Sequence, residues 1–183
     1  SYLQGHPDMK HIPGVDMSSG SLGQGISAAV GMAAAAKMTG ADYRVYTLLG
    51  DGEIQEGQVW EASMLAAHKK LDNLVVIVDN NNLQIDGAIT DVNSPYPIDK
   101  KFEAFNFHVI NIDGNDFDQI DAAFKEAKTV KGQPTAIIAK TVKGKGVSYM
   151  ENQAGWHGKA PNDEEYKIAM EDLEKAGEAL CQM

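Results

Sequence analysis

Two short runs of almost continuous apolar residues most constrain the fold of this chain. They are RVYTLLG (Arg44–Gly50) and NLVVIVDN (Asn73–Asn80). A strand with one face in water alternates apolar and polar residues, whereas a parallel strand covered on both faces reads as a continuous apolar run. We therefore expect both runs to be parallel strands. The stretch between them, Gln58–Lys70, predicts the helix that crosses over the sheet.

Further segments continue this alternation of strands and helices. LGQGISAAVGMAAAAKMTG predicts an Ala-rich helix that ends at Gly40, with Ser18, Ser19 and Ser21 as potential N-caps. Beyond the second run we expect a loop (81–97), a strand (107–112), a helix (117–131), a strand (135–141), a long mobile loop (142–163) and a charged helix (163–175) capped by Asp163. This order predicts an α/β fold, a doubly wound, mainly parallel sheet with helices on both faces.

The composition indicates one domain and excludes several kinds of partner. With 183 residues, 43% of them hydrophobic, the chain can form one well-buried domain, and we assign 1–183 to it. A formal net charge of −10 argues against binding to nucleic acid or to an anionic membrane. The sequence has no apolar segment of about 20 residues that could span a bilayer. Its first residues, SYLQGHPDMK, lack a basic region followed by an apolar core, so we expect no signal peptide. Because Cys181 is the single cysteine, we expect a reducing, cytoplasmic location.

Polar residues follow both apolar runs at the points where the predicted strands end. Asp51 follows the first run and Asn81 the second, about one βαβ unit later. Ligands of open parallel sheets bind beyond the carboxyl ends of the strands, so these two side chains should converge there. Gly50 and Gly52 would let an anion approach the backbone. Carboxylate and amide oxygens suit Mg²⁺ or Ca²⁺, and Mg²⁺ commonly shares its shell with ligand phosphates.

Each glycine motif taken alone has an ordinary explanation. The sequence Gly50–Gly52 is also what a turn between a strand and a helix requires. An EF-hand is excluded because oxygen ligands do not recur at the required spacing after Asp51. Gly20, Gly23 and Gly25 do not match the dinucleotide pattern, and alone they indicate a tight entry into a helix.

Two of the five histidines lie in irregular, glycine-containing segments. His6 lies in QGHPD and His157 in GWHGK, where packing in a regular element does not explain them. From composition alone, a functional role and an ordinary surface role remain equally open. His11, His68 and His108 read as ordinary surface or half-buried residues.

Several motifs together resemble the transketolase family. GDGEIQEGQVWEA followed by LDNLVVIVDNNNLQIDG resembles the thiamine diphosphate motif, which opens with Gly-Asp-Gly and closes with Asn one βαβ unit later. GHPD, SSGSLGQGIS, NNNLQIDG and GWHGKAPND, in this order, look like the diphosphate-binding half of a transketolase. The resemblance extends from Gly5 to Leu180 and implies the thiamine diphosphate-binding fold.

The resemblance also implies the site residues. The metal would be Mg²⁺, with Ca²⁺ as the alternative, and its ligands Asp51, Asn81 and the main-chain carbonyl of Leu83. Residues implied to contact thiamine diphosphate are Gly20, Ser21, Leu22, Gly50, Asp51, Gly52, Asn81, Ile85 and His157. The implied catalytic residues are His6, at the hydroxyl groups of the donor sugar, and His157, near the diphosphate and the reacting carbonyl. Many relatives have Pro in place of Ser21, a difference that leaves the main-chain contacts possible.

The implied activity is that of a transferase of the pentose phosphate pathway. Transketolases move a two-carbon ketol unit from a ketose phosphate to an aldose phosphate, and thiamine diphosphate stabilises the carbanion. In this family a second domain supplies the catalytic glutamate across a two-fold interface, and 1–183 contains no such domain. We therefore expect a subunit of a split transketolase, completed by a C-terminal subunit, or a piece of a longer chain. The family also has sequence before GHP, so an N-terminal segment is expected to be missing.

The resemblance further implies a homodimer, or a heterotetramer with the complementary subunit. The exposed surface around Gly20–Gly25 and the helix GISAAVGMAAAA is the expected contact, because it is poor in charge. Two other functions stay open. One is another thiamine diphosphate enzyme, such as a 2-oxo acid dehydrogenase E1 component or a deoxyxylulose phosphate synthase. The other is a non-catalytic cofactor-binding module.

Overall fold

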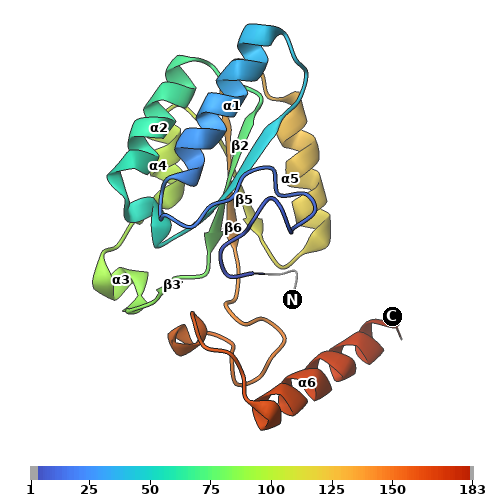
Figure 1. The fold of residues 1–183 in the computed structure, drawn as a ribbon. Helices are drawn as coiled ribbons and strands as arrows, with labels where there is room; N and C mark the ends of the chain where they lie inside the picture. Colours follow the sequence, from blue (N-terminus) through green and yellow to red (C-terminus); the bar gives the residue numbers. More distant parts are fainter. Residues whose placement is uncertain (1–3, 182–183) are drawn as a thin grey trace.

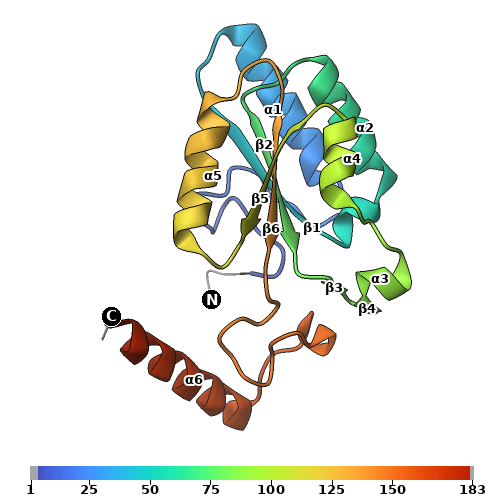
Figure 2. The ribbon, with the colours of Figure 1, turned by 180° about the vertical axis from the view of Figure 1, so that it is seen from behind.

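The computed structural model describes residues 4–181 and has a four-stranded parallel sheet at its centre (Figure 1). The strands are β1 (Val45–Gly50), β2 (Leu74–Asn80), β5 (His108–Asp113) and β6 (Thr135–Lys140), in the spatial order β1-β2-β6-β5. Because all three strand pairs are parallel, the four carboxyl ends lie at one edge of the sheet. The short elements that follow β1 and β2 gather at this edge, which is the lower one in Figure 2.

Helices cover both faces of the sheet. On one face lie α1 (Gly25–Thr39), α2 (Gly57–His68) and α4 (Ile98–Ala104), and on the other lies α5 (Phe117–Thr129). The chain moves from β1 through β2 to β5 in one direction and then returns through α5 to β6. Since crossovers between parallel strands are right-handed, this reversal puts α5 on the opposite face. The predicted doubly wound fold is confirmed.

The burial of β2 follows from its continuous apolar run. Leu74, Val76 and Val78 face the core beneath α1, α2 and α4, whereas Val75 faces α5. The alanines of α1 allow this helix to pack closely on the sheet. In β1 the prediction of burial on both faces is wrong, because Leu48 is 67% exposed. The reason is that β1 is an edge strand and α5 covers only part of the second face.

Several predicted boundaries differ from the structure. The helix predicted from Leu22 begins at Gly25, and its N-cap is Gln24, which makes no side-chain capping bond. The serine N-caps are therefore wrong. The helix ends as predicted at Gly40, which adopts a left-handed φ of 71°.

The loop predicted for 81–97 contains short regular elements. These are a hairpin of β3 (Leu83–Gln84) and β4 (Gly87–Ala88) and the one-turn helix α3 (Ile89–Val92). Together with the 3₁₀ helix η1 (Glu53–Gln55), they lie at the carboxyl edge of the sheet. The unpredicted α4 follows, and its Phe102 is fully buried.

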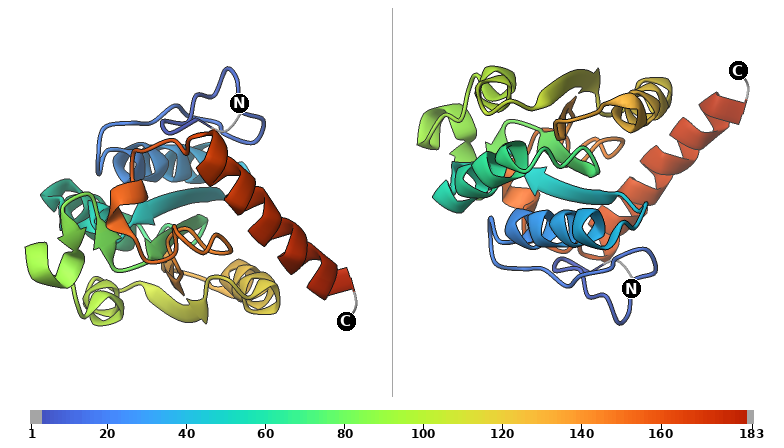
Figure 3. Two further views of the ribbon diagram at one scale, coloured as in Figure 1. Left: turned by 90° about the horizontal axis from the view of Figure 1, so that it is seen from below. Right: turned by 90° about the horizontal axis from the view of Figure 1, so that it is seen from above.

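The final helix is longer than predicted and has a different cap. The preceding segment, 142–163, contains the 3₁₀ helix η2 (Ala154–Trp156), and α6 runs over Asp163–Cys181. The side chain of Asn162, not Asp163, accepts hydrogen bonds from the N–H groups of Glu164 and Glu165. Figure 3 shows α6 extending away from the sheet. Across the part of the chain that the structure describes, no helix is long and apolar enough to cross a membrane.

Candidate functional site

Asp51 lies at the junction of β1 and β2, where the sequence places a ligand site. It is 1% exposed, and its N–H donates to the carbonyl of Asp79 across 3.1 Å. Its Oδ2 accepts two hydrogen bonds, from Nδ2 of Asn80 at 2.9 Å and from the N–H of Asn82 at 2.5 Å. The ends of β1 and β2 therefore meet at Asp51, but the residues that bind its carboxylate are Asn80 and Asn82, on either side of the predicted partner Asn81.

The electrostatics of Asp51 favour a cation. Burial raises the pKa of this carboxyl, and the nearby charge of Asp79 adds to the rise, while the bonds from Asn80 and Asn82 oppose it. Among residues 4–181 no basic side chain forms an ion pair with Asp51. A buried carboxylate without a cationic partner is costly. A bound divalent metal would supply the missing positive charge.

The neighbouring asparagines fit the same ligand chemistry. The side-chain oxygen of Asn82 is buried and accepts no hydrogen bond from the described residues, so the loop has an unsatisfied acceptor near Asp51. Oδ1 of Asn81 accepts the N–H of Leu83 at 3.0 Å, and Asn82 adopts a left-handed φ of 64°. Residues 4–181 contain no group of three or more His, Cys, Asp or Glu side chains that could hold a metal. A metal here would need amide and main-chain oxygens in addition to the Asp51 carboxylate, as the predicted ligand set has.

Gly52 permits close packing of the β3–β4 hairpin on the end of β1. A Cβ atom on Gly52 would lie 3.0 Å from Cβ of Gln84. The side-chain carbonyl of Gln84 accepts a 2.7 Å hydrogen bond from Nε2 of Gln55, which also donates to the main-chain carbonyl of Asn93. The space beside Gly52 is thus filled by this hairpin, a reason for glycine that the sequence does not reveal. The predicted contact residue Ile85 lies at the hairpin turn and is 68% exposed.

A cleft, which we call the polar cleft, brings together residues of the two N-terminal motifs GHPD and SSGSLGQGIS. It has a volume of about 380 Å³ and is lined by His6, Met17, Ser18, Ser19, Gly20, Ser21, Gln24 and Gly25. The His6 ring lies directly against Gly20, because a Cβ atom there would be 3.2 Å from Cδ2 of the ring. The predicted contact residue Leu22 follows the lining residue Ser21 in the sequence but does not itself line the cleft, and its side chain is largely exposed.

His157 lies apart from these contacts, in the segment that follows β6. Its side chain is exposed and forms no hydrogen bond to another predicted site residue in the described part of the chain. Its neighbour Trp156 is fixed by a 3.1 Å hydrogen bond from Nε1 to the carbonyl of Tyr149, and Nζ of Lys159 lies 4.1 Å from the Trp156 ring. The structure therefore orders the segment of His157 without joining it to Asp51 or His6.

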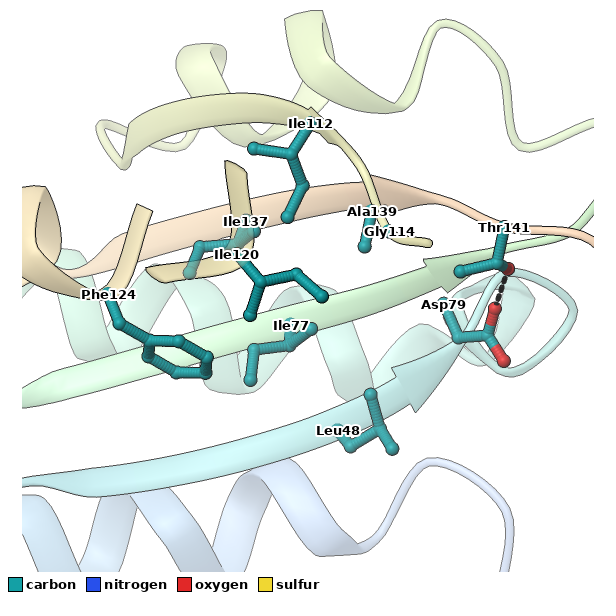
Figure 4. A pocket seen from close by; sticks show the side chains of 10 residues that line it. All are labelled: Leu48, Ile77, Asp79, Ile112, Gly114, Ile120, Phe124, Ile137, Ala139 and Thr141. Carbon is teal, nitrogen blue, oxygen red and sulfur yellow. Dashed lines mark hydrogen bonds between the residues drawn. The ribbon is translucent and has the colours of Figure 1, made fainter. Parts of the chain in front are cut away.

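An apolar groove of about 220 Å³ opens on the α5 face of the sheet, where β1 is uncovered (Figure 4). The side chains in it are Leu48, Ile77, Asp79, Ile112, Ile120, Phe124, Ile137, Ala139 and Thr141. At its polar end the hydroxyl of Thr141 donates to Asp79. None of the predicted site residues lines this groove, so its walls are separate from the polar cleft.

Two residues outside the predicted ligand and contact sets organise the site. Asn80 orients the Asp51 carboxylate, and the carboxylate of Glu53 accepts hydrogen bonds from the N–H groups of Gly23 and Gly50. The sequence signal for Asn80 is its place in the run Asn80–Asn82, next to the predicted ligand Asn81. The bond to Gly23 has no sequence signal, because it joins segments that only the fold brings together.

Comparisons with known proteins agree with this geometry. Residues 1–176 match the model of a family described as transketolase, thiamine diphosphate binding domain. The chain is 45% identical to the 6-deoxy-6-sulfo-D-fructose transketolase subunit of Clostridium sp. (strain MSTE9), over 96% of this chain and 64% of that protein. It is 43% identical to an apulose-4-phosphate transketolase subunit of Actinobacillus succinogenes, over 94% of this chain and 62% of that protein.

A solved structure and the human protein show the same similarity. The crystal structure of the Campylobacter jejuni transketolase matches with a TM-score of 0.85 and 38% sequence identity, over 93% of this chain and 28% of that one. The human transketolase is 48% identical over 87% of this chain and 25% of its own length. The chain thus spans less than two thirds of the length of each of these relatives.

Proposed function

Because the chain belongs to the transketolase family and matches its thiamine diphosphate-binding domain, we propose that it forms the diphosphate-binding half of a transketolase active site. The complete enzyme would transfer a two-carbon ketol unit from a ketose phosphate to an aldose phosphate. The observation that carries the proposal is the buried Asp51 carboxylate, held by Asn80 and Asn82 and lacking a cationic partner among the described residues.

The predicted ligands have the oxygen chemistry that Mg²⁺ prefers. In this proposal Asp51, Asn81 and the main-chain carbonyl of Leu83 hold the metal, which binds the diphosphate in turn. Ca²⁺ has the same preference for oxygen and is the alternative. Thiamine diphosphate, when bound, supplies the electron sink for the two-carbon unit. The residues proposed to contact it are Gly20, Ser21, Leu22, Gly50, Asp51, Gly52, Asn81, Ile85 and His157.

Two histidines act on the sugar in this proposal. His6, on the wall of the polar cleft, donates or accepts hydrogen bonds at the hydroxyl groups of the donor sugar. His157 donates a hydrogen bond or transfers a proton at its imidazole near the reacting carbonyl, a role that histidine side chains commonly take in general acid–base catalysis. Both side chains are exposed in this chain, and a second subunit would exclude water from them.

The proposed assembly of subunits follows from the proposal that this chain carries the diphosphate-binding half of the active site. Two of the relatives are named as transketolase subunits, which supports a complementary C-terminal subunit that carries the catalytic glutamate. We also propose self-association to a homodimer, and a heterotetramer once the complementary subunit binds. The contact is the exposed side of α1, where Lys37 is the one charged residue of the helix.

The proposal also covers the cellular location, the pathway and the domain organisation of the protein. We propose a cytoplasmic enzyme of the pentose phosphate pathway, and the single cysteine fits the reducing conditions of that location. The net charge of −10 argues against binding to nucleic acid or to an anionic membrane. The single-domain organisation of 1–183 belongs to the same proposal.

Reconstitution tests the proposed function. The chain is mixed with a C-terminal transketolase subunit, thiamine diphosphate and Mg²⁺, and the transfer from a ketose phosphate to an aldose phosphate is followed. We expect turnover that needs both subunits and is lost on Asp51→Ala, but not on Glu171→Gln, which removes an exposed charge from α6. Cofactor binding without turnover with any complementary subunit would indicate a non-catalytic binding module instead.

A further inference from the structure

The Glu53 carboxylate connects two glycine-containing segments that are far apart in the sequence. Its Oε1 accepts the N–H of Gly23 at 2.8 Å, and its Oε2 accepts the N–H of Gly50 at 3.0 Å. Gly23 belongs to the segment before α1, and Gly50 ends β1. Glu53 is the first residue of η1, immediately after the Gly50–Gly52 turn. The Glu53 side chain therefore bridges the Gly20–Gly25 segment and the Gly50–Gly52 turn, in both of which the resemblance implies cofactor contacts.

The surroundings of Gly23 are packed tightly around this bridge. Gly23 is buried and has a φ of 78°, and a Cβ atom on it would lie 2.8 Å from Cβ of Glu56. Nε2 of Gln58 donates to the carbonyl of Leu22 at 3.1 Å. These contacts hold the segment against the start of α2. Of the side chains of Glu53, Glu56 and Gln58, that of Glu53 also accepts the N–H of Gly50 at the end of β1.

The bridge needs the two equivalent oxygens of a carboxylate. Hydrogen bonds from N–H groups to a carboxylate are stronger than those between neutral groups. A glutamine of the same shape has one acceptor oxygen, and its NH₂ group would face a second N–H donor. Glu53→Gln therefore loses one of the two bonds without a change in volume, and leaves an N–H group unpaired.

We propose that Glu53 is a positioning residue, which sets the separation between the Gly20–Gly25 segment and the Gly50–Gly52 turn. The proposal rests on the proposed function, in which these two segments are opposite walls of the thiamine diphosphate site. Glu53 acts through the main chain of Gly23 and Gly50, and does not itself touch the cofactor. It prepares the site before the cofactor binds, and such preorganisation increases affinity.

The sign of the change in affinity separates positioning from simple electrostatics. If the charge of Glu53 acted only by repelling the diphosphate, its removal in Glu53→Gln would strengthen binding. Positioning predicts the opposite, a dissociation constant about tenfold higher, the effect expected from one lost charge-assisted hydrogen bond. Glu53→Asp keeps the charge but is too short by one methylene to reach both N–H groups, and should weaken binding similarly.

The experiment uses the full chain, with Glu171→Gln as the control that removes an exposed charge elsewhere. In the protein without cofactor, amide hydrogen exchange measured by NMR should be about tenfold faster in Glu53→Gln at Gly23 or at Gly50, whichever N–H group loses its acceptor. Exchange at Val76 and Ile137 in the core should remain unchanged. Titration with thiamine diphosphate at saturating Mg²⁺ then gives the affinity of each variant.

Different results would contradict the positioning role of Glu53 and the proposed function. Unchanged exchange at both Gly23 and Gly50, faster exchange throughout the core, or unchanged or tighter cofactor binding in Glu53→Gln would each overturn the positioning role. If the unsubstituted chain does not bind thiamine diphosphate even with its complementary subunit, the proposed function fails. Exchange at Gly23 and Gly50 then decides by itself whether Glu53 sets the separation of the two segments.

Discussion

The N–H of Asn82 donates to Oδ2 of Asp51 across 2.5 Å and so joins the loop after β2 to the turn after β1. Asn80 donates to the same oxygen from the other side of Asn81. Asn80 and Asn82, on either side of Asn81, therefore hold one buried carboxylate. This arrangement puts the single proposed charged ligand of the metal at the carboxyl edge of the sheet, between the ends of β1 and β2, and the predictions for Asp51 and Asn81 depend on it.

Asp51→Ala should abolish Mg²⁺-dependent binding of thiamine diphosphate. The substitution removes the one carboxylate in the proposed ligand set, and the remaining ligands are neutral oxygens. Calorimetry in the presence and absence of Mg²⁺ measures the effect. Unchanged affinity in this variant would contradict the metal assignment.

Asn81→Ala should weaken binding in the same direction as Asp51→Ala but by less, because it removes a neutral amide oxygen instead of a charged one. The same titration compares the two variants, and Asn115→Ala, at an asparagine outside the site, serves as the control. A larger loss for Asn81→Ala than for Asp51→Ala would reverse the proposed ranking of the ligands.

Asp51 should make the metal-free protein less stable at neutral pH than at mildly acidic pH. Burial raises its pKa in the folded state above the ordinary value of 3.8, so the folded protein binds this proton more tightly than the unfolded chain does. The contribution of Asp51 to stability therefore increases as the pH falls through the raised pKa, and levels off below 3.8.

Asp51→Asn isolates this effect from the other carboxyl groups. Denaturant unfolding without metal should show the variant more stable than the unsubstituted chain near neutral pH, with the difference shrinking as the pH falls. The variant should also lose the stabilisation that Mg²⁺ and thiamine diphosphate give. A difference in stability that does not change with pH would contradict the raised pKa.

Gly52→Ala should lower the free energy of unfolding by about 1–3 kcal/mol, because its methyl group would meet Cβ of Gln84 at 3.0 Å. Thermal or denaturant unfolding measures the loss. Gln84→Gly should restore part of it in the double variant, since it removes the opposing Cβ atom. Gly177→Ala in α6, where a Cβ atom meets nothing within 4 Å, is the matched control and should not destabilise. An equal loss in both single alanine variants would refute the packing role of Gly52.

The chain should form a homodimer or larger oligomer at micromolar concentration, and Mg²⁺ with thiamine diphosphate should stabilise it further. Ala35→Glu, on the exposed side of α1, should shift the equilibrium towards monomer because it puts a charge into an apolar contact. Ala179→Glu in α6 is the control. Sedimentation that shows a strict monomer with and without cofactor would contradict the shared site.

The sequence by itself determined the layers of the fold and the place of the site. The apolar run of β2 required burial on both faces, and its alternation with helical segments required a parallel sheet. The carboxyl ends of parallel strands share one edge, so the meeting of Asp51 with the Asn80–Asn82 segment could be predicted from order alone. Local signals also gave the end of α1 at Gly40, because glycine adopts its left-handed conformation without strain.

The tertiary structure alone decided which contacts hold the site together. Leu48 has the sequence of a buried strand residue but is exposed, because its burial depends on which helices cover the second face. Gln84 gives Gly52 its packing role, and Glu53 joins Gly23 to Gly50. Propensity and periodicity act over a few neighbouring residues, whereas these contacts join segments that meet only after the sheet has formed.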